Sequence, residues 1–233
     1  MTSSPTRSMA TLAFESLSTR ELVVTLVLLV LFGAGVAILL LGPRNELKGR
    51  GGNQDLPIKS LGTKPIQQIE LARNEADLRL ILLKGNARQN VTDARAGNIF
   101  DTFLFIPTYT AALLLMALLV ARGGVRDQRE LFWIMVILVA VIAVTDWSEN
   151  AGIERTLNHI DSGRGIQADD ANYISYPSMV KWTVIGLVLF ALGIAAIVKP
   201  PLAMRLFGIL LLVLGTAQLY QMVMYFRERF TPS

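Results

Sequence analysis

The sequence contains no cysteine and a single histidine, His159. Without cysteine the chain has no disulfide, thiolate metal site, iron–sulfur cluster or cysteine nucleophile. One histidine excludes bis-histidine haem ligation within the chain and disfavours an ordinary protein-only zinc site. Charge is also scarce, because 17% of the residues are charged, against about 25% in soluble domains. From the absence of cysteine and the single histidine, we expect no metal and no cofactor.

Apolar residues are correspondingly abundant. They make up 52% of the 233 positions, and the mean hydropathy is +0.47. A run of about 20 apolar residues is long enough to span a bilayer. Five segments have this character, namely 22–41, 102–121, 131–150, 179–198 and 202–226. The sequence thus predicts an all-α, polytopic membrane helix bundle with five transmembrane helices.

The polar segments between these spans indicate how the chain is organised. An amphipathic helix is predicted over 65–84, because apolar residues recur there at helical spacing between Pro65 and Gly85. This helix either lies on the membrane surface or caps the bundle. The predicted parts are a polar tail (1–21), a first transmembrane anchor (22–41), an extramembrane linker with the amphipathic helix (42–100), a four-span core (101–226) and a C-terminal tail (227–233).

The net charge of +4 does not indicate a nucleic-acid partner. Lys and Arg lie near the span ends, as in other membrane proteins, and they form no basic stripe. Their balance favours a cytoplasmic position for the long loop and the C-terminus. The expected partners are membrane lipids and partner subunits within the membrane, with no nucleic acid.

The last two spans are predicted to form a tight antiparallel hairpin. They are joined only by residues 199–201. Gly186 and Gly193 lie seven residues apart on one span, and Gly208 and Gly215 lie seven apart on the other. Seven residues are two helical turns, so each pair shares a face on which two backbones can approach closely.

Connectivity brings polar residues from four spans to one membrane face. The second and fourth spans start at the face that carries the long loop, and the third and fifth spans end there. We expect a ligand-binding polar cluster at this face. Its candidate residues are Asp101 and Tyr109 of the second span, Asp146, Glu149 and Asn150 of the third, Lys181 of the fourth, and Gln218 and Gln221 of the fifth.

Depth makes Asp146 the centre of this prediction. If the third span is centred near residue 140, Asp146 lies about 8–9 Å from the midplane at 1.5 Å per residue. A carboxylate that faced lipid there would cost about 2 kcal/mol or more, so we expect it to face the bundle interior. Lys181 is its natural counter-ion, although a lysine that snorkels beside Trp182 fits the sequence equally well.

Three further features each allow two interpretations. Pro107 breaks a helix hydrogen bond to Phe103 and kinks the second span. The hydroxyls that follow it, including Tyr109, either line a pocket or bond to another helix. His159 is predicted to be a loop histidine rather than a ligand, and Asp169 and Asp170 a solvated turn.

Short motifs add a resemblance. The chain contains "FIPTY" at 105–109 and "DWSEN" at 146–150, preceded by Glu-Leu-Ala at 70–72. This order resembles an uncharacterised group of bacterial multi-span membrane proteins with F-I-P-x-Y and D-x-x-E-N motifs. The resemblance covers roughly residues 66–226 and leaves the first span as an added anchor. It implies a multi-pass protein of the bacterial inner membrane and supplies no reaction.

Three functions remain open from the sequence. The polar cluster could bind a lipid or other amphiphile, with acid–base catalysis by Asp146 beside Glu149 as an extension. No nucleophile–base set is visible, so no catalytic residue is assigned and an enzyme is not favoured. The second function is an accessory subunit of a larger membrane complex. The third, a proton or cation pathway, has less support because the polar residues occupy one half of the bundle.

Overall fold

The computed structural model describes residues 65–121, 127–198 and 202–230. Within these ranges the chain is all-α. Four helical stretches are long and apolar enough to cross a membrane: Ala87–Ala121, Glu130–Asp161, Asp170–Ile197 and Arg205–Phe230. The all-α class and the four long apolar helices are therefore confirmed. The predicted anchor at 22–41 lies outside the described residues, as does the tail at 1–21.

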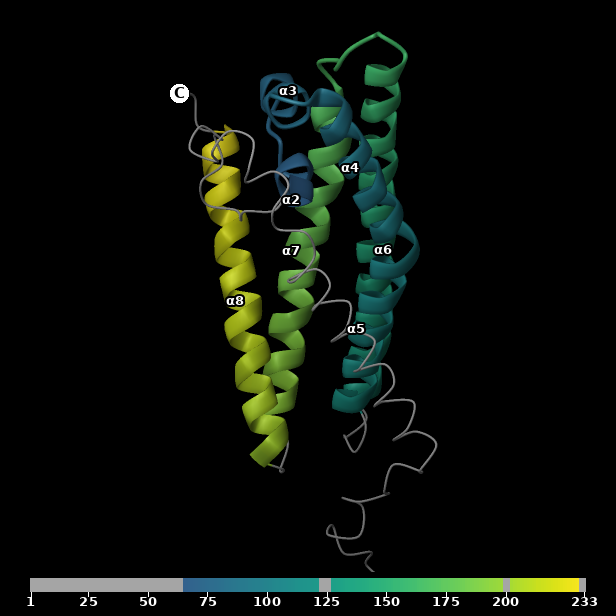
Figure 1. Cartoon of the computed structure of the whole chain (residues 1–233). Coiled ribbons are helices and arrows are strands. Elements are labelled where there is room, and N and C mark those ends of the chain that lie inside the picture. Colours follow the sequence, from purple (N-terminus) through teal and green to yellow (C-terminus); the bar gives the residue numbers. More distant parts are fainter. Residues whose placement is uncertain (1–64, 122–126, 199–201, 231–233) are drawn as a thin grey trace, which may run out of the picture.

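Four helices lie side by side and form the main bundle (Figure 1). They are α5 (Ile106–Ala121), α6 (Asp127–Asp161), α7 (Asp170–Ile197) and α8 (Leu202–Phe230). α6 packs against α5 and α7, and α7 packs against α8. Apolar side chains fill the bundle core, among them Ile142, Val188 and Leu192, which are fully buried.

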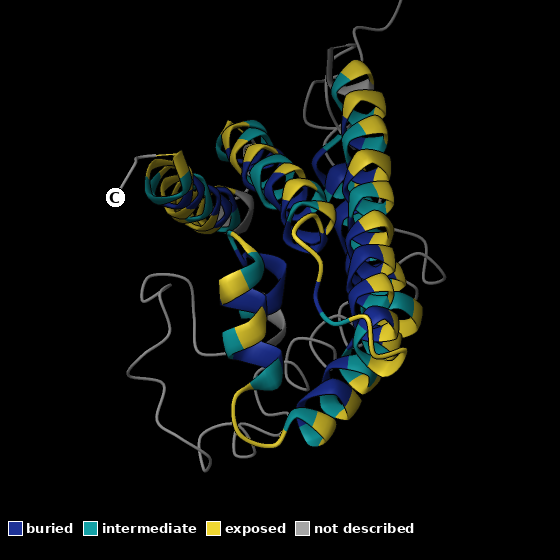
Figure 2. Ribbon diagram, turned by 90° about the horizontal axis from the view of Figure 1, so that it is seen from above, coloured by how far each residue is buried: buried dark blue, intermediate teal, exposed yellow. Residues whose placement is uncertain are grey.

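The outward faces of the bundle are apolar as well. Seen along the bundle, buried residues face the neighbouring helices and exposed residues face outward (Figure 2). Ile137 of α6, Ile194 of α7 and Val213 of α8 are each at least half exposed. Exposure to water costs about 25 cal/mol per Å² of apolar surface, whereas lipid tails are as apolar as these side chains. The surface of the bundle therefore suits hydrocarbon.

Glycines let α7 and α8 approach closely. A Cβ added at Gly208 would lie 2.7 Å from the backbone nitrogen of Ile197 and 2.8 Å from the carbonyl oxygen of Gly193. A Cβ at Gly215 would lie 2.9 Å from the carbonyl oxygen of Gly186. The two glycine pairs therefore face each other across the hairpin, where the sequence predicted close packing.

A smaller helical layer covers one end of the bundle, and we call it the cap. It contains α2 (Pro65–Glu70), α3 (Glu75–Leu83) and α4 (Ala87–Phe100), which pack around the end of α6 and the start of α7 (Figure 1). The cap has its own apolar core, in which Leu78 and Leu82 of α3 meet Leu157 of α6 and Ile174 of α7. The 65–84 segment was expected either to lie on the membrane surface or to cap the bundle, and in the structure it forms part of the cap.

The 65–84 segment is two helices rather than the single helix predicted. α2 ends at Glu70, and α3 begins after Asn74. The Asn74 side chain accepts a hydrogen bond from the Asp77 backbone N–H (3.0 Å), and Asp77 accepts one from the Arg73 backbone N–H (3.0 Å). These bonds satisfy the free N–H groups of a helix start, so they favour a new helix over continuation.

The predicted linker and loop are also partly helical. α4 lies within the predicted 42–100 linker and continues into α5 through a π-helical segment, η2 (Asp101–Phe105). α6 has 35 residues and ends at Asp161, well beyond the predicted end at 150. Tertiary burial explains both differences, because the cap core contains apolar residues from α4 and from the extension of α6.

Candidate functional site

Acidic residues from three elements surround one lysine at the junction of cap and bundle. Glu70 closes α2, Asp101 opens η2, Asp146 and Glu149 lie on α6, and Lys181 lies on α7. We call these five residues the Lys181 cluster. Asp146, Glu149 and Lys181 are 1%, 0% and 3% exposed, so their charged groups are withdrawn from solvent.

Lys181 is the counter-ion at the centre of this cluster. Its Nζ lies 2.8 Å from Asp146 Oδ1 and 2.8 Å from Glu149 Oε2. Glu70 Oε2 is more distant, at 3.6 Å. The contact with Glu149 lies outside hydrogen-bond geometry, and Glu149 Oε1 has no hydrogen-bond partner among the described residues. Lys181 was expected to be either an interior counter-ion or a snorkelling lysine, and in the structure it is a buried counter-ion.

Asp146 is the most completely bonded acid of the cluster. Its Oδ1 accepts a hydrogen bond from Lys181, and its Oδ2 accepts one from the Tyr109 hydroxyl at 2.5 Å. Tyr109 is itself buried against the apolar core of the bundle. Hydrogen bonds to an ionised acceptor are shorter and stronger than neutral ones. The bond joins α5 to α6, and bonding to a neighbouring helix was one of the two roles expected for Tyr109.

Asn150 connects Asp101 to the remainder of the cluster. Its Nδ2 donates to Asp101 Oδ2 (2.8 Å) and to the Thr102 hydroxyl (2.9 Å), and its carbonyl oxygen accepts from Asn98 Nδ2 (3.1 Å). Asn150 follows Asp146 by four residues, so the two side chains project from one face of α6. Asp101 is half-buried and also interacts electrostatically with Asp146 and Lys181.

Glu70 and Trp182 join the site from positions that the sequence analysis did not select as site residues. Trp182 Nε1 donates to Glu70 Oε2 at 3.1 Å, and Glu70 is 5% exposed. Glu70 appeared in the sequence only as part of the Glu-Leu-Ala stretch at 70–72. Glu70 is buried with its neighbours Leu71 and Ala72, and this burial becomes visible only in the folded structure.

The two glutamines proposed from α8 lie apart from this set of contacts. Gln218 is half-buried and Gln221 is exposed. No hydrogen bond within residues 65–121, 127–198 and 202–230 joins either of them to the Lys181 cluster. The hydroxyls of Thr108 and Thr110 donate to the carbonyl oxygens of Leu104 and Ile106 at 2.6 Å, so these hydrogen bonds stay within the helical stretch Ala87–Ala121.

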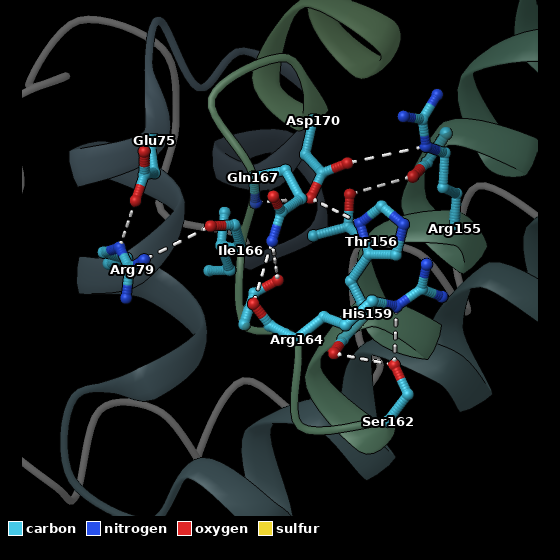
Figure 3. Close-up of polar contacts among 12 residues, drawn as sticks. Glu75, Arg79, Arg155, Thr156, His159, Ser162, Arg164, Ile166, Gln167 and Asp170 are labelled. Atoms are coloured by element: carbon cyan, nitrogen blue, oxygen red, sulfur yellow. Dashed lines mark hydrogen bonds and ion pairs between the residues drawn. The ribbon is translucent and has the colours of Figure 1, made fainter.

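A second polar group fastens α6 to α7 inside the cap (Figure 3). Asp170 is fully buried; its Oδ2 lies 3.0 Å from His159 Nδ1 and accepts the Gln167 backbone N–H at 2.8 Å. Arg155 Nε lies 3.7 Å from Asp170 Oδ1. The prediction of a loop for His159 was wrong, since it lies in the last turn of α6. Asp170 is likewise buried rather than solvated, because it opens α7 against this turn.

The Lys181 cluster lies between two apolar cores. On α6, its acids lie between Ile142 of the bundle core and Ile153 of the cap core. On α7, Lys181 lies between Ile174 of the cap core and Val188 of the bundle core. Apolar packing on both sides keeps water from the ionic groups and strengthens their interactions. The arrangement can hold charges in fixed pairs and exchange protons among adjacent carboxyls.

Comparison of the chain with protein-family models, with curated proteins and with solved structures finds no match.

Proposed function

We propose that the chain is a multi-pass protein of the bacterial inner membrane in which the Lys181 cluster reversibly binds a proton. The charge balance of the cluster carries this proposal. Four carboxyl groups surround one ammonium group, so full ionisation would leave a net charge of −3. Within the described residues, no other cation forms an ion pair with these four acids.

Protonation is the simplest way to remove this excess charge. Burial of an unpaired ion costs several kcal/mol, and a buried carboxyl group avoids this cost by taking up a proton. A bound metal cation would also neutralise acids. In the described ranges, however, no three acidic or histidine side chains are arranged to hold one. A proton therefore fits the cluster better than a metal ion does.

The hydrogen bonds assign different roles to Asp146 and Glu149. Both oxygens of Asp146 have a donor, as a lasting carboxylate requires. One oxygen of Glu149 has no partner in spite of complete burial. A neutral carboxyl group tolerates such an oxygen better than a carboxylate does. Asp146 and Lys181 thus form the resting ion pair, and Glu149 holds the exchangeable proton.

Proton uptake and release take place on the face that carries the cap. Beyond Tyr109, the described bundle core toward the opposite end consists of apolar side chains, among them the fully buried Ile142 and Val188. This packing gives a transmembrane proton pathway less support. The proposed function is a protonation-dependent response at one membrane face.

Infrared difference spectroscopy tests the proposal. Purified protein in lipid bilayers should give the carbonyl-stretching band of a water-excluded, protonated carboxyl group at neutral pH. Glu149→Gln should remove this band, because the substitution replaces the carboxylic acid whose carbonyl stretch gives the band. The matched control is Glu154→Gln, on the same helix, where Glu154 forms a partly exposed ion pair with Arg95. Absence of the band in the wild-type protein would contradict the proposal.

An amphiphile remains the second candidate ligand. Asp101 is half-buried beside Phe103 and Leu104, which are 77% and 49% exposed. A polar group next to exposed apolar side chains suits a cationic headgroup with its tail along α5. Mass spectrometry of the purified protein would detect such a ligand. Its retention in Asp101→Asn at the wild-type level would contradict this assignment.

The accessory-subunit proposal depends on the outward apolar faces. Residues such as Ile137, Ile194 and Val213 can contact a partner helix as readily as lipid. Co-purification in mild detergent is the test. A stable partner would support the proposal, and a monodisperse single chain would contradict it.

A further inference from the structure

Asp101 differs from the other three acids of the Lys181 cluster in its exposure. Glu70, Asp146 and Glu149 are all at most 5% exposed, whereas Asp101 is half-buried. It lies where α4 of the cap passes into α5 of the bundle. Among the four acids, Asp101 is therefore the most accessible, and its hydrogen bond to Asn150 connects it to α6.

A π-helical turn aims Asp101 at the bundle interior. The Ile106 backbone N–H donates to the Asp101 carbonyl oxygen, five residues back, at the turn that precedes Pro107. In a regular α-helix, Asp101 and Tyr109 would be rotated by about 80° from each other, at roughly 100° per residue. One extra residue in the turn reduces this rotation to about 20°. The π turn therefore brings Asp101 onto the face from which Tyr109 reaches Asp146.

The charged groups around Asp101 come from three elements. Asp146 projects from α6, Lys181 from α7 and Glu70 from α2, and each interacts electrostatically with Asp101. Asn150 holds Asp101 Oδ2 by a hydrogen bond of 2.8 Å. Asn150 and Asp146 share one face of α6, so Asp101 lies next to Asp146, which shares the Lys181 ammonium group with Glu149. Asp101 is thus connected through Asp146 and Lys181 to Glu149, to which the proposed function assigns the proton.

We propose that Asp101 is the entry residue for proton exchange with the Lys181 cluster. A hydronium ion gives a proton to the Asp101 carboxylate and leaves water. Asp101 then gives this proton to the Asp146 carboxylate, and Asp146 passes it to the Glu149 carboxylate, so that Asp101 and Asp146 both return to their ionised forms. Release follows the same steps in reverse. This inference rests on the proposed proton-binding function and adds the route by which the buried carboxyl group equilibrates.

A pH jump followed by time-resolved infrared spectroscopy tests the route. In Asp101→Asn, the band of the protonated cluster carboxyl should respond about 100-fold more slowly, the typical loss when a positioned acid–base group is removed. Asp101→Glu should restore most of the rate, because it restores a titratable group. A small permeant weak acid such as formic acid should also accelerate exchange in Asp101→Asn. A purely structural role for Asp101 would show none of this rescue.

Asp93→Asn is the matched control, since Asp93 is a half-buried acid of α4 that accepts a hydrogen bond from Gln89 Nε2 (2.6 Å). Its exchange rate should equal that of the wild type. A wild-type rate in Asp101→Asn would overturn the inference, whereas absence of the band in the wild type itself would overturn the proposed function.

A second measurement needs no variant. A water-soluble carbodiimide should modify Asp101 before Glu70, Asp146 and Glu149 in the wild-type protein, and the modification should slow exchange. Earlier modification of Glu149 would contradict the assigned route.

Discussion

At Asp146, one carboxylate joins three helices. Lys181 of α7 bonds one of its oxygens and Tyr109 of α5 the other. The sequence predicted the inward direction of Asp146 because a charge at that depth is costly in lipid. It also proposed Lys181 as the counter-ion. The Tyr109 bond could be foreseen only as an alternative, since its direction depends on how α5 is rotated against α6.

Tyr109→Phe tests this bond. The substitution removes the hydroxyl that donates to a buried carboxylate, so we expect a loss of about 1.5–3 kcal/mol in the free energy of unfolding. Chemical denaturation in detergent micelles would measure it. Tyr220→Phe is the control, because Tyr220 is 65% exposed, and its effect should stay within about 0.5 kcal/mol. Equal effects at the two tyrosines would contradict the assigned bond.

At the scale of the elements, local hydrogen-bonding chemistry modified the predicted helices. The periodicity at 65–84 indicated one amphipathic helix, yet the Asn74 cap begins a second one. Pro107 indicated a kink, and the structure has a π turn just before it. Both signals were present in the sequence. Their outcome depended on whether the cap core buries the apolar faces on each side of the break.

The α7–α8 interface gives a prediction at this scale. In Gly208→Ala, the added Cβ would meet backbone atoms of Ile197 and Gly193 at 2.7–2.8 Å. Backbone atoms cannot move without separating the helices, so we expect destabilisation of about 1–3 kcal/mol.

Gly97→Ala has the opposite expected sign. Nothing lies within 4 Å of a Cβ at Gly97, and alanine favours a helix interior by about 1 kcal/mol over glycine. Thermal unfolding in the same detergent compares the two variants. Destabilisation of equal size in both would argue against close packing at Gly208.

For the whole molecule, the longest helix exceeds the thickness of a bilayer. α6 has 35 residues, so it is about 52 Å long at 1.5 Å per residue, whereas the hydrocarbon layer is about 30 Å thick. Its last turns carry the cap core and the buried pair of His159 and Asp170. The Lys181 cluster lies at the boundary between the apolar bundle and the cap. In the proposed multi-pass arrangement, the cap would lie beyond the bilayer.

Cysteine labelling tests the placement of the cap and the bundle relative to the bilayer. Because the natural sequence has no cysteine, only the introduced cysteine can react. Ser162→Cys, in the exposed turn after α6, should react with a membrane-impermeant maleimide. Val213→Cys should resist it, because Val213 lies on the outward apolar face of α8. Reaction in inverted vesicles but not in intact cells would agree with the cytoplasmic loop predicted from Lys and Arg. Equal labelling of the two cysteines would contradict the membrane placement.

The sequence by itself determined the helical class, the four long apolar helices and the face at which their polar residues meet. These properties follow from composition, span length and connectivity, which are readable along one chain. Tertiary structure decided which polar groups touch: Glu70 enters the Lys181 cluster, Asp101 turns inward on a π turn, and His159 is buried. The physical reason is that hydrogen bonds and burial depend on helix rotation and on the cap, and both are settled by packing between segments distant in sequence.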